Sequence, residues 1–143
     1  MFVDGQLRFQ SDWVETTVAV HIGTDTVDCE VATPNFGVGT PLWVNVVVHA
    51  AFVGAGSSEQ FTLWDTQDDA ATPGQPDAAA WLVLIQSEVY LVGACVLGMP
   101  VFVTPLPAYH RRHLKLTWEI SGAVLTEGSI NAWIGLDPAP DNS

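Results

Sequence analysis

The sequence is poor in basic residues. Lys and Arg together number 4 against 16 Asp and Glu, which gives a formal net charge of −12. Such a chain repels the phosphate backbone of nucleic acids and the anionic surface of a membrane. We therefore expect neither nucleic acid nor membrane among its partners.

Cysteine is also scarce. Cys29 and Cys95 are the only two and form no C-x-x-C pair, so neither a disulfide framework nor a cysteine-rich metal or redox site is predicted. Two buried thiols are expected, and the sequence leaves a single bridge between them open. The chain begins Met-Phe-Val-Asp without a basic segment before an apolar one, so we expect it to be made and used inside a cell.

Catalytic signatures are missing as well. The sequence contains no G-x-S-x-G, P-loop, kinase or protease motif, and we expect no enzyme and no cofactor. Two uncharged runs, Val31–Ser58 and Val89–Tyr109, are interrupted by proline and glycine. They therefore predict buried strands joined by turns rather than membrane-spanning helices.

The clearest positive pattern is strict alternation in Arg111–Ser121. Leu114, Leu116, Trp118 and Ile120 alternate with His113, Lys115, Thr117 and Glu119. Successive side chains of a strand point to opposite faces, so this segment predicts a half-buried strand.

Similar segments recur along the chain, and no segment has a helical period. The further strand candidates are Phe2–Phe9, Trp13–Ile22, Val27–Val31, Pro41–Phe52, Gln60–Thr66, Trp81–Ser87, Val89–Val96, Val101–Thr104 and Ser129–Leu136. Together they predict an all-β fold, a single-domain, jelly-roll-like β-sandwich of about eight to ten strands over residues 1–143. Residues 1–10 are a candidate extended arm, and residues 138–143 a frayed polar tail.

The alternation also predicts which side chains face the core. Val14, Val18, Val20 and Ile22 are expected to face inward, as are Ile130, Ala132, Ile134 and Leu136. Trp13, Trp43 and Trp133 then fall on the opposite faces, and exposed aromatic rings often mark binding surfaces. The alternative is that a second layer or a loop covers these rings.

Two groups of side chains are candidates for metal binding. His49 lies on a mixed strand face with Asn45, where ordinary polar packing is the favoured interpretation. Asp65–Ala80, called the acidic loop below, carries Asp65, Asp68, Asp69 and Asp77. Crowded carboxylates suit calcium, but the loop lacks the EF-hand pattern, so a solvated loop is favoured and no metal site is predicted.

Several short motifs, in order, resemble the capsid cement or decoration proteins of short-tailed bacteriophages, in particular the Bordetella-phage type. They are Asp4-Gly5-Gln6-Leu7-Arg8-Phe9 with Ser11, Gly37-Val38-Gly39-Thr40-Pro41-Leu42, Asp68-Asp69, Arg112-His113-Leu114-Lys115-Leu116, and Leu125-Thr126-Glu127-Gly128 with Ala132 and Leu136-Asp137. The chain departs from that family's pattern in an extra Gln10 before Ser11 and in its many tryptophans.

The resemblance implies a jelly-roll-like sandwich without catalytic residues on the exterior of a phage capsid, made in the host bacterial cytoplasm. The implied partners are the major capsid protein, whose subunits it bridges, and further copies of itself, as a homodimer or homotrimer at a capsid symmetry axis. The candidate contact residues come from the N-terminal arm, the tryptophans and the basic patch: Phe2, Asp4, Gln6, Arg8, Trp13, Trp43, Arg111, Arg112, Lys115 and Trp133.

Other interpretations remain open from sequence. A carbohydrate-binding β-sandwich would use Trp43, Trp133 and the acidic loop on a host-surface glycan, and a β-barrel metalloenzyme would centre on His49. Arg111 and Arg112 either neutralise acidic loops of their own chain or bind another protein.

Overall fold

The computed structural model describes residues 7–29, 42–107 and 109–143. It is almost entirely β, as the alternation predicts. The strands are β1 (Arg8–Trp13), β2 (Ala19–Ile22), β3 (Val27–Asp28), β4 (Trp43–Gly54), β5 (Ser58–Thr66), β6 (Leu82–Gln86), β7 (Tyr90–Leu91), β8 (Pro100–Pro105), β9 (His113–Ser121) and β10 (Leu125–Gly135). A short 3-10 turn, Val92–Ala94, follows β7 where the sequence predicts a continuous strand.

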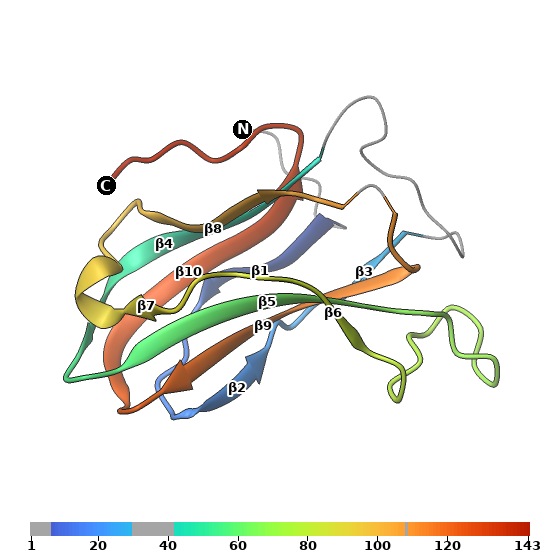
Figure 1. The fold of residues 1–143 in the computed structure, drawn as a ribbon, viewed down its shortest axis with the longest axis horizontal. Helices are drawn as coiled ribbons and strands as arrows, with labels where there is room; N and C mark the ends of the chain where they lie inside the picture. The colour runs from blue at the N-terminus through green and yellow to red at the C-terminus, as the bar shows by residue number, and fades with distance from the viewer. Residues whose placement is uncertain (1–6, 30–41, 108) are drawn as a thin grey trace.

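The strands form two antiparallel sheets that pack face to face (Figure 1). The first has the order β1-β10-β4-β8, and the second has the order β2-β9-β5-β6. β2 and β3 both pair with β9, one after the other along the same edge of that strand. In the same way, β6 and β7 both pair with the same edge of β5. Each sheet thus has four strand positions. Along the chain the strands alternate between the sheets except at β2–β3 and at β5–β7, which stay in the second sheet, and this order is that of a jelly roll. The predicted β-sandwich is confirmed.

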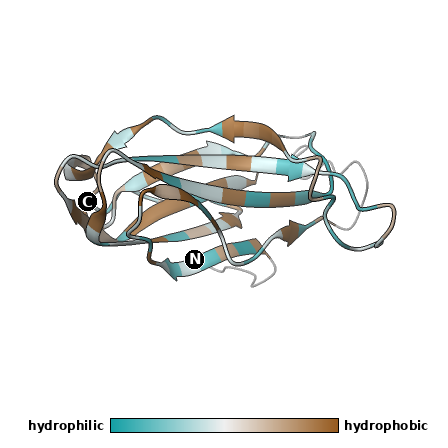
Figure 2. Ribbon diagram, turned by 90° about the horizontal axis from the view of Figure 1, so that it is seen from below, coloured by the Kyte–Doolittle hydropathy of each residue, from teal (hydrophilic) through white to brown (hydrophobic). Residues whose placement is uncertain are grey.

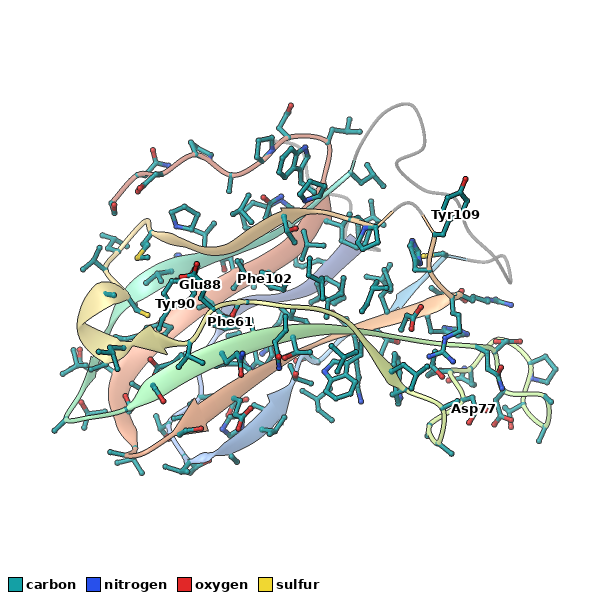
Figure 3. All side chains as sticks on the ribbon, viewed as in Figure 1. Phe61, Asp77, Glu88, Tyr90, Phe102 and Tyr109 are labelled. Atoms are coloured by element: carbon teal, nitrogen blue, oxygen red, sulfur yellow. The ribbon has the colours of Figure 1, made fainter. Side chains whose placement is uncertain are left out.

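The core lies between the two sheets, and each sheet contributes large apolar side chains to it (Figure 3). Trp118 of β9 stacks on Phe52 of β4 with ring centroids 5.2 Å apart, and Trp13 of β1 meets it edge-on at 5.7 Å. Phe61 of β5 lies against the same indole at 5.8 Å. One aromatic cluster therefore joins four strands, two from each sheet.

A glycine is required where β10 passes this cluster. Gly128 has φ of 143°, and a Cβ at this position would lie 2.6 Å from Cδ1 of Phe52. Any larger residue would push Phe52 away from Trp118.

The long central strand β4 has the predicted pair of faces. Val44, Val46 and Val48 are buried toward the core, while Asn45 on the mixed face is also fully buried. The C-terminal tail explains this burial, because Asn45 Nδ2 donates to the Asp137 carbonyl at 3.2 Å and Asn45 Oδ1 accepts from the Ala139 N–H at 2.8 Å. The tail, which the sequence predicts to be frayed, thus crosses β4 and runs back over its sheet (Figure 1).

The sequence places one strand wrongly. Trp13–Ile22 is not continuous, because Trp13 ends β1 in the first sheet and β2 begins at Ala19 in the second. Trp13, predicted to be outward, is completely buried, and the predicted inward residues Val14, Val18, Val20 and Ile22 are 51–57 % exposed. Leu136 is also outward, at 66 % exposed, because it follows the end of β10. When the chain passes from one sheet to the other, the set of side chains that faces the core can change. The alternation of apolar and polar residues alone does not show where the chain passes between sheets.

Candidate interaction surfaces

The predicted basic patch is largely engaged within the molecule. Arg111 binds Asp65 through its backbone N–H, its Nε and its Nη2, and the same Nη2 donates to the Ala80 carbonyl at 2.8 Å. Arg112 forms a bidentate pair with Asp28 at 2.7 and 2.9 Å. Of the two interpretations left open by the sequence, these contacts favour counter-charges for the chain's own aspartates.

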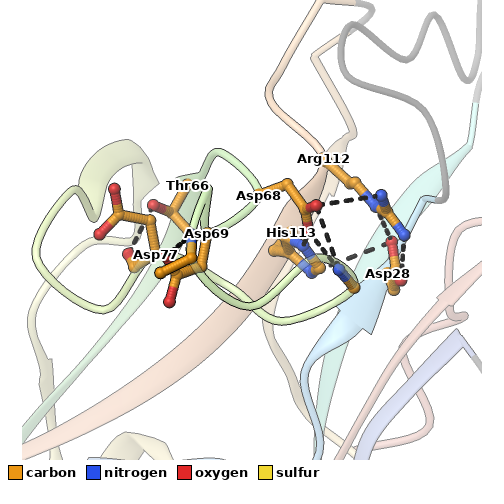
Figure 4. A network of polar contacts seen from close by, with 9 residues as sticks. Asp28, Thr66, Asp68, Asp69, Asp77, Arg112 and His113 are labelled. Atoms are coloured by element: carbon orange, nitrogen blue, oxygen red, sulfur yellow. Dashed lines mark hydrogen bonds and ion pairs between the residues drawn. The ribbon is translucent and has the colours of Figure 1, made fainter.

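The acidic loop is fastened to the second sheet by this cluster (Figure 4). Asp68 accepts a hydrogen bond from Nε2 of His113 at 2.8 Å and from the Gly74 N–H at 3.1 Å, and lies 3.5 Å from Nη1 of Arg112. The His113 bond, with the Gly74 bond second, lowers the pKa of the Asp68 carboxyl.

The loop carboxylates are also occupied locally. Asp69 accepts from the Ala71 N–H at 2.9 Å, and Asp77 accepts from the Ala79 N–H at 3.0 Å, so each closes a turn of its own segment. Among the described residues no three His, Cys, Asp or Glu side chains gather as a metal site would require.

Lys115, the third member of the basic patch, lies on the outer face of the second sheet. Its Nζ is 4.5 Å from the centre of the Trp81 ring and 5.4 Å from that of Trp64. The Trp64 indole N–H in turn donates to Thr117 Oγ1 at 2.9 Å. The ammonium group is therefore held between two aromatic rings by cation–π attraction, and its burial lowers its pKa.

The second sheet also ends in an exposed apolar edge. Val20 and Ile22 share the outer face of β2, opposite Glu119 and Thr117 of β9. Val18 and Val14, which precede β2 in the chain, are also more than half exposed, and we call these four residues the apolar row. β2 is the terminal strand of the order β2-β9-β5-β6. Figure 2 shows apolar residues alternating with polar ones along the strands, so an apolar outer face at an edge is a departure from the general pattern.

The first sheet has a groove on its outer face. A hollow of about 450 Å³ lies between β1, β10 and the C-terminal tail. The lining includes Arg8 and Gln10 of β1, Asn131 and Trp133 of β10, and Ala139 and Pro140 of the tail. Asn131 and Trp133 point outward from β10 as predicted, while Ile130, Ala132 and Ile134 are buried.

The structure does not bring the remaining predicted site residues into one place. Trp43 begins β4 and is half-buried, and Phe2, Asp4 and Gln6 lie outside the described residues. His49 is exposed and has Asn131 at 3.4 Å and Asp12 at 4.0 Å as polar neighbours. The acidic loop is attached to the second sheet and contributes no described residue to the groove that contains Trp133. The structure thus does not assemble the tryptophans and the acidic loop into one site.

The two cysteines remain apart. Cys29 and Cys95 are free and buried, so the bridge left open by the sequence is absent. Burial, reinforced by Asp28 beside Cys29 and by Glu59 near Cys95, raises the pKa of each thiol to about 12.

The model of the Bbp16 family matches residues 14–134, which is most of the chain. The chain belongs to the Bbp16 family. The family name is that of a Bordetella phage protein, and no curated protein matches the sequence.

The part matched to the Bbp16 family extends from the loop after β1 to the end of β10. It contains the apolar row, the whole second sheet and the arginine–aspartate cluster. β1 and the C-terminal tail, which form two walls of the groove, lie outside it. No described helix has the length and apolarity needed to span a membrane.

Proposed function

We propose that this chain is a structural virion protein that binds the outer surface of a tailed-phage capsid as a cement or decoration protein. In this role it bridges and stabilises subunits of the major capsid protein, and it assembles with itself as a homodimer or homotrimer at a capsid symmetry axis. It is made in the host bacterial cytoplasm and has no enzymatic activity. Membership of the Bbp16 family and the motif resemblance to phage cement proteins support the proposal.

The observation that carries the proposal is the apolar row. Val14, Val18, Val20 and Ile22 are each more than half exposed on a chain with a net charge of −12. An apolar surface at the open edge of a sheet is a feature of proteins that bind other proteins. A capsid subunit seated on this edge would bury the row and could pair with the free backbone groups of β2.

The test is reconstitution on capsids that lack this protein. Purified wild-type protein should sediment with such capsids, and decorated capsids should survive heating and osmotic shock better than bare ones. The variant Val20→Ser/Ile22→Ser should bind at least tenfold more weakly, because two apolar side chains no longer leave water on binding.

A matched control is the pair Leu97 and Val89, which are 61 % and 60 % exposed. Leu97 follows the 3-10 turn, and Val89 precedes β7 at the edge of the second sheet opposite β2. Leu97→Ser/Val89→Ser should bind like the wild type. Absence of wild-type binding, or unchanged heat and osmotic resistance after decoration, would refute the cement function. Equal weakening by both double variants would refute the role of the apolar row.

A further inference from the structure

The groove on the first sheet contains an arginine without an acidic partner. Arg8 is half-buried at the start of β1 and forms no ion pair with any described residue. The other two arginines, Arg111 and Arg112, bind aspartates, and the Lys115 ammonium lies between two indole rings. In a chain with 16 acidic residues, a guanidinium in a groove with no ion partner among the described residues is a positive charge suited to an acidic ligand.

The groove also offers hydrogen-bond donors, and the side-chain acceptor oxygens of Gln10 and Asn131 in its lining are already used. Gln10 Oε1 accepts from the Thr24 N–H at 3.0 Å, and Asn131 Oδ1 accepts from the Asp12 N–H at 2.7 Å. The Gln10 amide N–H₂ group donates to no described residue and remains available beside Arg8. Hydroxyl groups of a neutral sugar need acceptors as well as donors, whereas a carboxylate only accepts.

We propose that this groove binds a carboxylate of an acidic, extended segment of a partner protein, with Arg8 as the ion partner and the Gln10 amide as the second donor. The proposal rests on the proposed function, which makes the partner a capsid protein and adds this groove to the apolar row as a second contact. A volume of about 450 Å³ is in the range of small binding sites and accommodates a few residues. The tail already lies extended along one wall, which shows that the face accepts a chain in this conformation.

A direct titration tests the groove without capsids. ¹H–¹⁵N spectra of the whole protein are recorded with the pentapeptide Ac-Ala-Ala-Glu-Ala-Ala-NH₂ and with its Gln counterpart. The Glu peptide should shift the Arg8 Nε–H and the Gln10 side-chain amide signals, and the Gln peptide should not. Equal shifts with both peptides would overturn the proposal. Glucuronic acid forms a third arm, and shifts with this sugar acid but not with the Glu peptide would overturn the assignment to a protein segment.

Capsid binding then tests the inference separately from the function. Arg8→Gln should bind capsids about tenfold more weakly, because a charge-assisted hydrogen bond is lost, and Arg8→Lys should recover part of the affinity. Gln75→Glu, at an exposed position of the acidic loop, changes the net charge by the same amount and should bind like the wild type. Equal binding by wild type and Arg8→Gln would overturn the groove contact while leaving the cement function intact. Shifts with the Glu peptide but no wild-type capsid binding would refute the function and leave the groove as a carboxylate site.

Discussion

The Asp68 carboxylate accepts a 2.8 Å hydrogen bond from the ring of His113, a residue that is only 1 % exposed at the start of β9. Asp68 belongs to the acidic loop, so this bond fastens a long loop to the beginning of β9, a central strand of the second sheet (Figure 4). The bond makes Asp68 a structural anchor and explains why His113, on the predicted polar face of its strand, is nevertheless covered.

Replacing Asp68 by Asn should loosen the acidic loop without unfolding the sandwich. The neutral amide loses the charge that attracts His113 and Arg112, so the Gly74 amide should exchange its hydrogen faster while β9 and β5 stay protected. Hydrogen exchange followed by NMR measures both. Asp69→Asn is the control, because the Asp69 carboxylate accepts a hydrogen bond within its own turn, from the Ala71 N–H.

Acid should have the same effect on the wild type. Since folding lowers the pKa of Asp68, the stabilising contribution is present above the unfolded value of about 3.9 and is lost as the pH falls through the lower folded value. Protection of Gly74 that persists in acid, or that is unaltered in Asp68→Asn, would contradict the anchoring role.

Trp13 should behave as a core residue. It is fully buried and packs edge-on against Trp118, so Trp13→Ala should lower the free energy of unfolding by about 3–5 kcal/mol. Denaturant titration measures this loss. Tyr109→Ala, which removes an aromatic ring that is 81 % exposed and projects from the molecule (Figure 3), should change the stability by less than about 0.5 kcal/mol. A Trp13→Ala protein as stable as the wild type would restore the surface role predicted from sequence.

The sequence predicts the fold well where one strand stays in one sheet. The alternation in His113–Ser121 and the inward set Ile130, Ala132 and Ile134 are found as predicted, because the pleat alone determines which residues share a face. It fails between Trp13 and Ala19, where the chain changes sheet and the buried face changes with it. It also misses the groove, because Arg8 and Trp133 are 125 positions apart and meet only through the pairing of β1 with β10. Long-range pairing leaves no local pattern in the sequence.

The two cysteines should be unreactive in the folded protein. Both thiols are free and buried, and their pKa values of about 12 leave almost no thiolate at pH 8. Ellman's reagent should therefore label no cysteine in the native state and two in denaturant. Rapid native labelling would contradict the burial, and a denatured protein with no free thiol would indicate a disulfide.

Glu59 should destabilise the protein at neutral pH. It is completely buried between the sheets, and neither carboxylate oxygen forms a hydrogen bond of normal geometry with a described residue. Burial raises its pKa, and the neighbouring Ser57 hydroxyl offsets only part of this increase. The folded state therefore holds the proton more tightly than the unfolded state, whose pKa is about 4.3. The free energy of unfolding should fall as the pH rises above that value, until the folded pKa is passed.

The variant Glu59→Gln removes this titration. It should be more stable than the wild type at pH 8, by on the order of 1 kcal/mol, and the difference should shrink toward pH 4. Thermal unfolding at several pH values measures it, with the exposed Glu88→Gln as the control of equal charge change. A stability difference that is independent of pH would show that Glu59 is not the titrating group.

Variants of Arg111 and Arg8 should distinguish an arginine that pairs with charges of its own chain from one that binds a partner. Arg111 binds the carboxylate and the carbonyl of Asp65 and the carbonyl of Ala80, so Arg111→Ser leaves a nearly buried aspartate unpaired. The free energy of unfolding should fall by about 2 kcal/mol. Arg8→Ser removes an arginine that has no ion partner among the described residues, and its stability should match the wild type. Denaturant titration gives both values, and capsid sedimentation of the folded proteins gives the binding. If Arg111→Ser stays as stable as the wild type but loses capsid binding, Arg111 is a contact residue and its pairing with Asp65 contributes little to the fold.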